Sequence, residues 1–297
     1  MVNRRLPEWL TVKAPKRGAY EELSNYLTSM GLHTVCQSAN CPNIGECFSR
    51  KTATFMILGN ICTRNCGFCS VQHGSPLPVD ADEPVRVAKA AAEMGLKYVV
   101  VTSVTRDDLP DGGANQFAET IRRLRAEIPD VKIEVLIPDF GGDEASLKVV
   151  LEAEPFVLNH NVETISRLYQ TVRPQADYVR SLRLLETAKR IAPSVYTKSG
   201  FMVGLGESRQ EVKDLLVDLR SSACEIVTIG QYLRPSKSNL PAVEYVHPDV
   251  FEEYKGIAES LGFFFVASGP FVRSSYHAAE IISCNSNLHD KPERQGP

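Results

Sequence analysis

Six of the chain's eight cysteines lie between Cys36 and Cys69, where they form two triplets of different spacing. Thiols crowded in this way more often bind metal than form structural disulfides, because disulfide-bonded proteins usually spread their cysteines along the chain. The other two, Cys224 and Cys284, stand alone. We expect Cys224 to be buried in the core between a helix and a strand, and Cys284 to be a thiol of the C-terminal tail.

The second triplet, Cys62, Cys66 and Cys69, has the spacing C-x3-C-x2-C in ICTRNCGFCS. Three thiolates on a tight loop can hold three irons of a [4Fe–4S] cluster, which usually takes four cysteines. With no fourth cysteine nearby in the sequence, one iron would stay open to bind a small molecule through amino and carboxylate groups. A zinc site is the alternative, but zinc loops favour C-x2-C or C-x4-C pairs and four ligands.

The first triplet, Cys36, Cys41 and Cys47, has the spacing C-x4-C-x5-C in VCQSANCPNIGECFS. Taken alone, it could also be a zinc knuckle or a redox disulfide. Near the other end of the chain stands GPFVRSSYHA, residues 269–278, which by itself reads as a polar loop with a capping serine.

Composition narrows the class of protein. The 297 residues carry a formal net charge of −3, which gives no general attraction to nucleic acid or membranes. The basic N-terminus lacks the apolar run of a signal peptide, and no apolar stretch is long enough to span a bilayer. We therefore expect a cytoplasmic monomer with no nucleic-acid or membrane partner, in a compartment where thiols stay reduced.

From residue 52 onward, short β-rich runs alternate with helical patterns. The predicted strands cover residues 52–60, 97–105, 131–140, 155–163, 195–207 and 225–235. The predicted helices cover residues 83–94, 114–128, 143–152, 177–191, 208–221 and 248–260. Pro84 suits a first helical turn, and Ser208 with Glu211 reads as a capping box.

This alternation predicts parallel strands joined by helical crossovers. The expected fold is α/β, a partial (β/α)6 TIM-like barrel, with an open doubly wound sheet as the alternative. We expect an N-terminal extension of little periodicity over residues 1–50, the barrel over 51–265, and a C-terminal segment with the RSSY motif over 266–297.

Ligands of such folds bind at the carboxyl ends of the strands. Polar motifs stand at the predicted positions: VTSVTRDDLPDGGA (101–114), NHNVET (159–164), KSGFMVGLGE (198–207) and QYLRPS (231–236). Within the second motif, His160 could be a metal ligand, but a hydrogen-bonded structural histidine is the favoured interpretation.

Taken together, these motifs resemble the lipoyl synthases of the radical S-adenosylmethionine (SAM) superfamily. The second triplet, with Phe68 before its last cysteine, resembles the superfamily signature. The upstream triplet and RSSY resemble lipoyl synthases in particular, over about residues 35–278. Another two-cluster radical enzyme, such as a methylthiotransferase or a peptide-modifying enzyme, is the nearest alternative. A two-cluster electron carrier and a zinc-bound interaction domain are more distant ones.

The resemblance implies two [4Fe–4S] clusters and SAM as cofactors. Cys62, Cys66 and Cys69 would hold the cluster that cleaves SAM to a 5′-deoxyadenosyl radical, which takes hydrogen from unactivated C–H bonds. The first triplet and Ser275 would hold a second cluster that is sacrificed as the sulfur donor, with Ser274 as the less favoured ligand. Arg273 would steady that cluster or move with the serine.

The resemblance also implies contacts with SAM for residues at the strand ends. SAM contacts are expected at polar residues of the barrel mouth, although each is also compatible with ordinary polarity there: Thr102, Asn159, Asn161, Glu163, Arg173, Lys198, Gly204, Gly206 and Glu207. In this interpretation Arg173 and Lys198 pair with the carboxylate of SAM, and Glu207 accepts its hydroxyls. The glycines allow close backbone approach.

The implied substrate is an octanoyl chain on a lysine of a carrier, either a lipoyl domain of a 2-oxoacid dehydrogenase or the glycine cleavage H protein. Sulfur would enter at C6 and C8, with electrons from a ferredoxin or flavodoxin. The basic leader could steer an acidic carrier by electrostatic attraction; its cations are Arg4, Arg5, Lys13, Lys16 and Arg17.

Overall fold

A computed structural model describes residues 6–11, 17–39, 41–49, 54–275 and 278–281. Its main element is an eight-stranded sheet in the order β1-β2-β5-β6-β7-β8-β9-β10. The short β1 pairs antiparallel with β2, and every other neighbouring pair is parallel. The strands are β1 (His33–Thr34), β2 (Thr54–Ile57), β5 (Tyr98–Ser103), β6 (Lys132–Leu136), β7 (Val157–Asn159), β8 (Tyr196–Val203), β9 (Ile226–Gln231) and β10 (Phe265–Gly269).

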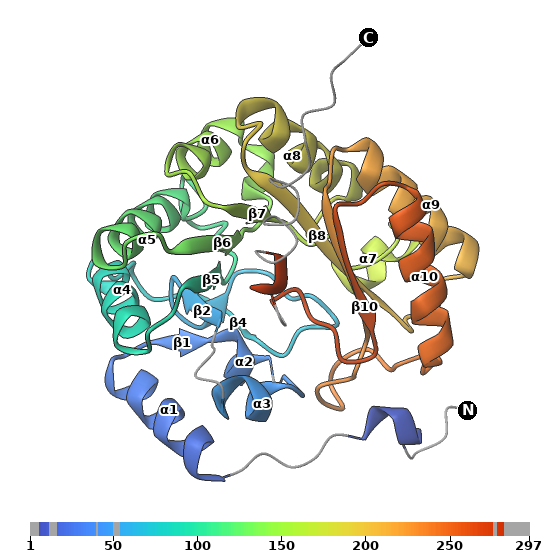
Figure 1. The fold of residues 1–297 in the computed structure, drawn as a ribbon, viewed down its shortest axis with the longest axis horizontal. Helices are drawn as coiled ribbons and strands as arrows, with labels where there is room; N and C mark the ends of the chain where they lie inside the picture. The colour runs from blue at the N-terminus through green and yellow to red at the C-terminus, as the bar shows by residue number, and fades with distance from the viewer. Residues whose placement is uncertain (1–5, 12–16, 40, 50–53, 276–277, 282–297) are drawn as a thin grey trace, which may run out of the picture.

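Figure 1 shows these strands curving into an incomplete ring with the crossover helices outside it. The predicted partial barrel is therefore confirmed, and the open doubly wound sheet is not what forms. The outer helices are α4 (Glu83–Glu93), α5 (Ala114–Glu127), α6 (Glu144–Glu152), α8 (Tyr178–Ile191), α9 (Arg209–Ser221) and α10 (Pro248–Ser260).

Local start signals explain where these helices begin. Pro84 lies in the first turn of α4, where its missing N–H leaves no hydrogen bond unmade. Ser208 and Glu211 form the predicted capping box at α9, each side chain bonding the backbone of the other. Cys224, between α9 and β9, is fully buried in the core, as predicted.

The N-terminal extension has more structure than its sequence indicated. It contains a 3₁₀ turn, η1 (Glu8–Leu10), and three helices, α1 (Arg17–Ser29), α2 (Val35–Ser38) and α3 (Ile44–Ser49). The expectation of little periodicity is thus wrong for α1, whose Leu23 and Leu27 are buried four residues apart on one face.

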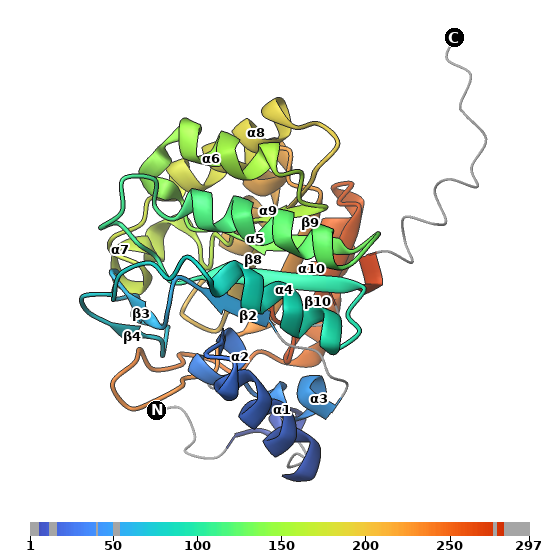
Figure 2. The same ribbon diagram turned by 90° about the vertical axis from the view of Figure 1, so that its left-hand side faces the viewer.

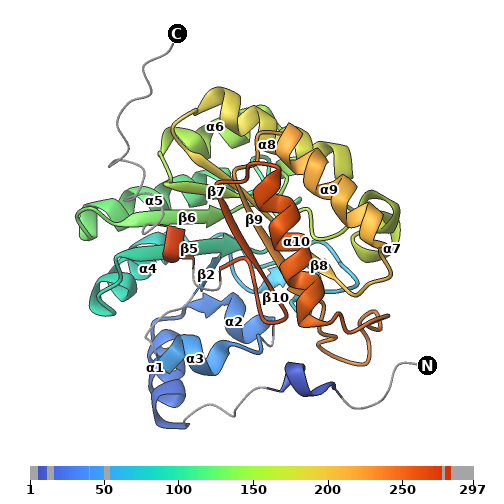
Figure 3. The same ribbon diagram turned by 45° about the vertical axis from the view of Figure 1, so that its right-hand side comes forward.

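Several further elements were absent from the predicted set, although α10 was in it. The strand β10 adds a seventh parallel strand, and α10 lies along it in Figure 3. A small two-stranded sheet, β3 (Ile61–Cys62) with β4 (Gln72–His73), brackets the second cysteine triplet. Short turns η2 (Phe140–Gly142) and η3 (Ser166–Leu168) and helix α7 (Tyr169–Val172) follow other strands.

A buried polar layer crosses the inside of the barrel. The Lys198 ammonium lies 2.8 and 3.0 Å from the Glu134 carboxylate oxygens. Asn159 and Tyr98 donate to the same carboxylate at 3.1 and 2.7 Å. Because two opposite charges with hydrogen bonds satisfy each other, this layer can persist with side-chain exposures of only 1% and 0% for Lys198 and Glu134.

The last described residues close the barrel at the amino ends of its strands. Ile281 is fully buried against Val157 and Ile226. Figure 2 shows β3 and β4 at one end of the barrel and the red segment Ala278–Ile281 at the other. Within the part of the chain that the structure describes, no helix is long and apolar enough to cross a membrane.

Candidate cluster and cofactor site

A cavity of about 470 Å³ opens at the carboxyl ends of the strands. Its wall combines residues from both cysteine triplets, the strand ends and the C-terminal segment. The motif residues on it are Cys36, Cys41, Cys62, Cys66, Cys69, Thr102, Asn161, Glu163, Arg173, Arg273, Ser274 and Ser275. Cys47 lies in the same segment as Cys36 and Cys41 but does not line the cavity.

Backbone contacts fix the loop that carries the second triplet. The Gly67 N–H donates to the Val172 carbonyl at 2.9 Å, and the Leu240 N–H donates to the Gly67 carbonyl at 2.9 Å. The Asn239 amide donates to the Cys69 carbonyl at 2.8 Å. A Cβ at Gly67 would lie 2.9 Å from the Leu240 side chain, so a larger residue would make Leu240 shift; the position favours glycine because of crowding rather than φ.

Arg64, inside this loop, makes the strongest tie to the barrel. Its guanidinium donates twice to Asp107, at 2.7 Å each, and twice to Asp139, at 2.7 and 3.0 Å. Arg180 adds a 3.0 Å bond to Asp139. Burial disfavours the charged Asp139 carboxylate, but the Arg64 guanidinium outweighs burial and lowers the pKa of Asp139.

The first triplet lies on two short helices and the turn between them. Cys36 is on α2, whose N-terminus is capped by the Thr34 hydroxyl, and Cys47 is on α3. The Cys41 N–H donates to the Cys36 carbonyl at 3.0 Å, so the turn brings these two cysteines together. The Ser70 hydroxyl donates to the Ser38 carbonyl at 2.7 Å and joins the two cysteine-bearing loops.

Burial holds the thiols of both triplets in the protonated form while no metal is bound. Burial raises the pKa of Cys36 and Cys66 to about 11 and that of Cys69 to about 12. Among the described residues, no three His, Cys, Asp or Glu side chains converge on one point that would hold a single ion. Zinc needs such convergence, whereas each thiolate of a four-iron cluster binds a different iron. The two sets of three thiols are compatible with thiolate-bound clusters.

The C-terminal segment completes the wall beside the first triplet. The Asn43 amide donates to the Phe271 carbonyl at 2.7 Å, and the Asn161 amide donates to the Ser274 hydroxyl at 2.7 Å. Ser274 is thus engaged with Asn161, and Ser275 lines the cavity beside it.

Arg273 is one of the cations that line the cavity. Burial lowers the pKa of its guanidinium, and the neighbouring Cys41 and Glu163 oppose that shift. Its charge therefore lies between a cysteine of the first triplet and an acid of the predicted SAM site.

Four of the predicted SAM contacts line the cavity: Thr102, Asn161, Glu163 and Arg173. Two of them have buried polar atoms without a partner among the described residues, Asn161 Oδ1 and Arg173 Nε. Buried polar atoms are rarely left unpaired in native proteins. The amino and carboxylate groups of a bound SAM are a fitting complement to this pair.

The other five predicted contacts do not line it: Asn159, Lys198, Gly204, Gly206 and Glu207. Lys198 and Asn159 belong to the polar layer around Glu134, which lies deeper inside the barrel than the cavity. Glu207 accepts from the N–H groups of Gly204 and Leu205 in its own turn. Lys198 and Glu207 are thus engaged within the described fold, whereas Asn159 Oδ1 is buried without a partner there. The contacts of these five residues with SAM stay predictions.

His160 has the structural role favoured from sequence. Its Nδ1 lies 2.9 Å from the Ile137 carbonyl oxygen and its Nε2 lies 3.1 Å from the Ser181 hydroxyl. Burial lowers its pKa to about 4, so the imidazole is neutral near pH 7.

Comparison with known proteins decides the family. The family model of the Radical SAM superfamily matches residues 56–219. A lipoyl synthase of Caldanaerobacter subterraneus subsp. tengcongensis is 58% identical over 274 residues, covering 92% of this chain and 96% of that protein. One from Caldicellulosiruptor saccharolyticus is 56% identical over 280 residues, covering 94% and 98%. The chain belongs to the lipoyl synthase family.

As a member of the lipoyl synthase family, the chain is a radical SAM enzyme, which implies a [4Fe–4S] cluster and SAM. Solved structures agree in fold. Methylornithine synthase matches with a TM-score of 0.50 at 14% identity, covering 95% of this chain and 91% of that one. Streptococcus suis SuiB bound to S-adenosylmethionine matches with a TM-score of 0.55 at 10% identity, covering 85% and 55%.

Sequence reasoning on this lipoyl synthase family member missed the residues that hold the site together. Arg64, Asp107 and Asn43 lie in motifs noted from the sequence and Asp139 lies in a predicted strand, but their partners are 43 to 228 positions away. The one signal in the sequence was an arginine, Arg64, between two cysteines of the second triplet, since an arginine in such a tight loop indicates a carboxylate partner.

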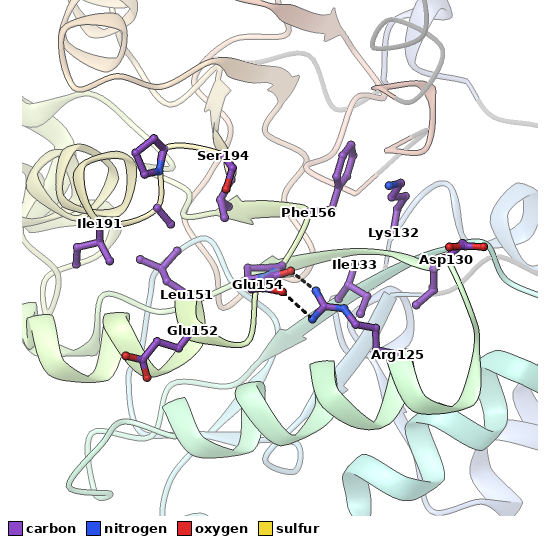
Figure 4. Close-up of a pocket in the computed structure, with 15 residues that line it drawn as sticks. Arg125, Asp130, Lys132, Ile133, Leu151, Glu152, Glu154, Phe156, Ile191 and Ser194 are labelled. Atoms are coloured by element: carbon purple, nitrogen blue, oxygen red, sulfur yellow. Dashed lines mark hydrogen bonds and ion pairs between the residues drawn. The ribbon is translucent and has the colours of Figure 1, made fainter. Parts of the chain in front are cut away.

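A second cavity, of about 890 Å³, lies at the opposite, amino ends of β6, β7 and β8 (Figure 4). Arg125 pairs with Glu154 on its wall, and the Lys132 ammonium lies 4.9 Å from the centre of the Phe156 ring. None of the predicted site residues lines it. Five of the six motif cysteines line the smaller cavity instead.

Proposed function

We propose that this enzyme inserts two sulfur atoms, at C6 and C8, into an octanoyl chain carried on a lysine of a lipoyl domain or of the glycine cleavage H protein. One observation supports this most strongly. Five of the six motif cysteines, together with Ser275, face a single cavity. A radical source and a sulfur donor must both reach one alkyl chain, and a shared cavity allows that.

The second triplet would hold the radical cluster, with Asn161, Glu163 and Arg173 around the charged end of SAM. When bound, the cluster and SAM supply a radical able to take hydrogen from an unactivated carbon. The protein orients the alkyl chain and excludes water with apolar walls. The wall residues suited to this are Phe68, Val71, Leu136, Phe201 and Met202.

Cys36, Cys41, Cys47 and Ser275 would hold the second cluster as the sulfur donor. An alkoxide is a harder ligand than a thiolate, so the serine-bound iron should be the more easily released. The half-buried Arg273 guanidinium beside Cys41 would offset the negative charge of that cluster. In this scheme residues 1–50 and 266–297 supply the donor site, and residues 51–265 form the radical barrel.

Anaerobic turnover tests the proposal. Full-length protein, which should hold about eight irons if two clusters are present, is incubated with SAM and an octanoylated lipoyl domain or H protein. A ferredoxin or flavodoxin supplies electrons, with dithionite as a chemical control. Mass spectrometry should find two added sulfurs, and size-exclusion chromatography should find a monomer. Cleavage of SAM without thiolation would instead favour another two-cluster enzyme, such as a methylthiotransferase.

A further inference from the structure

Asn43 joins the two ends of the chain at the donor site. Its side-chain amide donates to the carbonyl of Phe271, 228 residues later, at 2.7 Å, and the residue is only 4% exposed. We propose that Asn43 is a positioning residue that holds the C-terminal segment closed over the first triplet, and so sets the place of Ser275. The inference rests on the proposed function, because it assigns Ser275 to a second cluster.

The backbone of Asn43 organises the triplet itself. Its N–H donates to the sulfur of Cys41, and its carbonyl accepts from the Cys47 N–H at 3.0 Å. The Cys41 N–H in turn donates to the Cys36 carbonyl at 3.0 Å. One residue thus contacts two cysteines of the triplet through its main chain and the serine-bearing segment through its side chain.

The C-terminal segment is confined on its other side by the barrel. A Cβ added at Gly230 on β9 would lie 2.2 Å from the Val272 carbonyl oxygen, so the segment passes directly over that strand. Asn161 holds Ser274 at 2.7 Å. Phe271 comes four residues before Ser275, and its carbonyl is the point where the segment meets the N-terminal extension.

Figure 1 and Figure 3 place α2 and α3 at the opening of the ring, between its β1 and β10 edges. No strand pairing closes the described barrel there, because β1 and β10 are the two ends of the sheet. The Asn43–Phe271 bond therefore spans the open side of the barrel. Breaking it should let the serine-bearing segment lift away without disturbing the strands that surround the radical cluster.

The test compares wild type, Asn43→Ala, Asn43→Asp and the matched control Asn239→Ala, all as full-length chains. Asn239 is also an asparagine whose amide donates to a backbone carbonyl, that of Cys69 at 2.8 Å, but in the other triplet. Hydrogen exchange of the peptide covering residues 270–275 is measured first, in metal-free protein. Loss of one such bond should speed that exchange by about tenfold in both Asn43 variants and leave it unchanged in Asn239→Ala.

Reconstituted enzymes are then compared for iron release to a chelator and for SAM cleavage. Asn43→Ala should lose about half of its iron several-fold faster than wild type and still cleave SAM. Asn239→Ala should slow SAM cleavage instead. The aspartate variant, which keeps the size of asparagine but cannot donate to a carbonyl, should behave like alanine or worse.

Unchanged exchange at residues 270–275 would overturn the inference, as would equal loss of both clusters or global unfolding of both Asn43 variants. A wild type with only one four-iron cluster would defeat the proposed function alone, since the exchange measurement needs no metal. The two failures are thus separable.

Discussion

Arg64 shows how one side chain can position a reactive loop. Four hydrogen bonds from its guanidinium reach Asp107 and Asp139, at the ends of β5 and β6. Arg64→Ala should destabilise the fold by about 3 kcal/mol, because Asp139 stays buried with a partner removed. Arg64→Lys should restore little, since an ammonium cannot make paired bonds to two carboxylates.

Thermal unfolding and SAM cleavage measure this. Arg180→Ala is the control, because Arg180 pairs with the same Asp139 at 3.0 Å but lies outside the loop. Both variants should lower Tm, and only the Arg64 variants should also slow SAM cleavage severely. Equal cleavage by the alanine variants of Arg64 and Arg180 would show that the arginine stabilises the fold without positioning the cysteines.

At Ser275, the chemistry of the ligand atom itself can be tested. Ser275→Cys replaces a hard oxygen by a soft thiolate, which should bind iron more firmly. The variant should keep its full iron content and its rate of SAM cleavage, but lose most sulfur insertion, because the donor cluster no longer opens easily. Ser274→Cys serves as the control. If Ser275→Cys made lipoyl product at the wild-type rate, easy loss of the serine ligand would not be part of the reaction.

At the scale of elements, the alternation of β-rich and helical patterns, together with residues typical of helix starts, predicted the six parallel strands and their six helices. Ser208 and Pro84 marked helix starts because a cap acts within one turn of chain. The strand β10 escaped because all its residues, Phe265–Gly269, are half-buried and show no alternation. The helix α1 escaped because its buried leucines, Leu23 and Leu27, lie in a largely polar segment.

His160 ties three elements together and makes the fold sensitive to acid. It lies on the segment after β7 and bonds Ile137 after β6 and Ser181 on α8. Its pKa is lowered to about 4 in the fold from 6.5. Between these two pKa values the unfolded chain binds a proton at His160 that the folded chain does not. The contribution of His160 to the free energy of unfolding is therefore fully present above pH 6.5 and is lost as the pH drops toward 4.

Chemical denaturation of metal-free protein should show this loss, which amounts to about 2 kcal/mol at pH 5. The matched variant His160→Gln keeps a hydrogen-bonding side chain without the titration. It should be less stable at pH 7, and its stability should change less between pH 7 and 5. An identical pH slope in both proteins would mean that other groups cause the acid sensitivity.

At the scale of the whole molecule, the candidate ligand cysteines could be recognised from their spacing because they are close together in the sequence. The contacts that place them could not. Arg64 meets Asp139 across 75 residues and Asn43 meets Phe271 across 228, and no sequence period encodes such pairings. Lys198 illustrates the same limit within one strand. The sequence indicated that Lys198 lies at the mouth of the barrel. Its exact position along the strand decides whether its side chain reaches the cavity or the buried polar layer below the cavity.

The buried polar layer around Lys198 and Glu134 allows a test of what stabilises the inside of the barrel. Lys198→Ala should leave Glu134 buried and uncompensated, at a cost of about 3–5 kcal/mol of stability. Adding Glu134→Leu should restore much of the loss, because an apolar pair removes the stranded charge. A residue that instead binds SAM would show the reverse pattern: a raised KM for SAM with little change in Tm, and no rescue by the second substitution. Measuring Tm and the KM for SAM in the single and double variants therefore shows whether Lys198 stabilises the buried polar layer or contacts the cofactor.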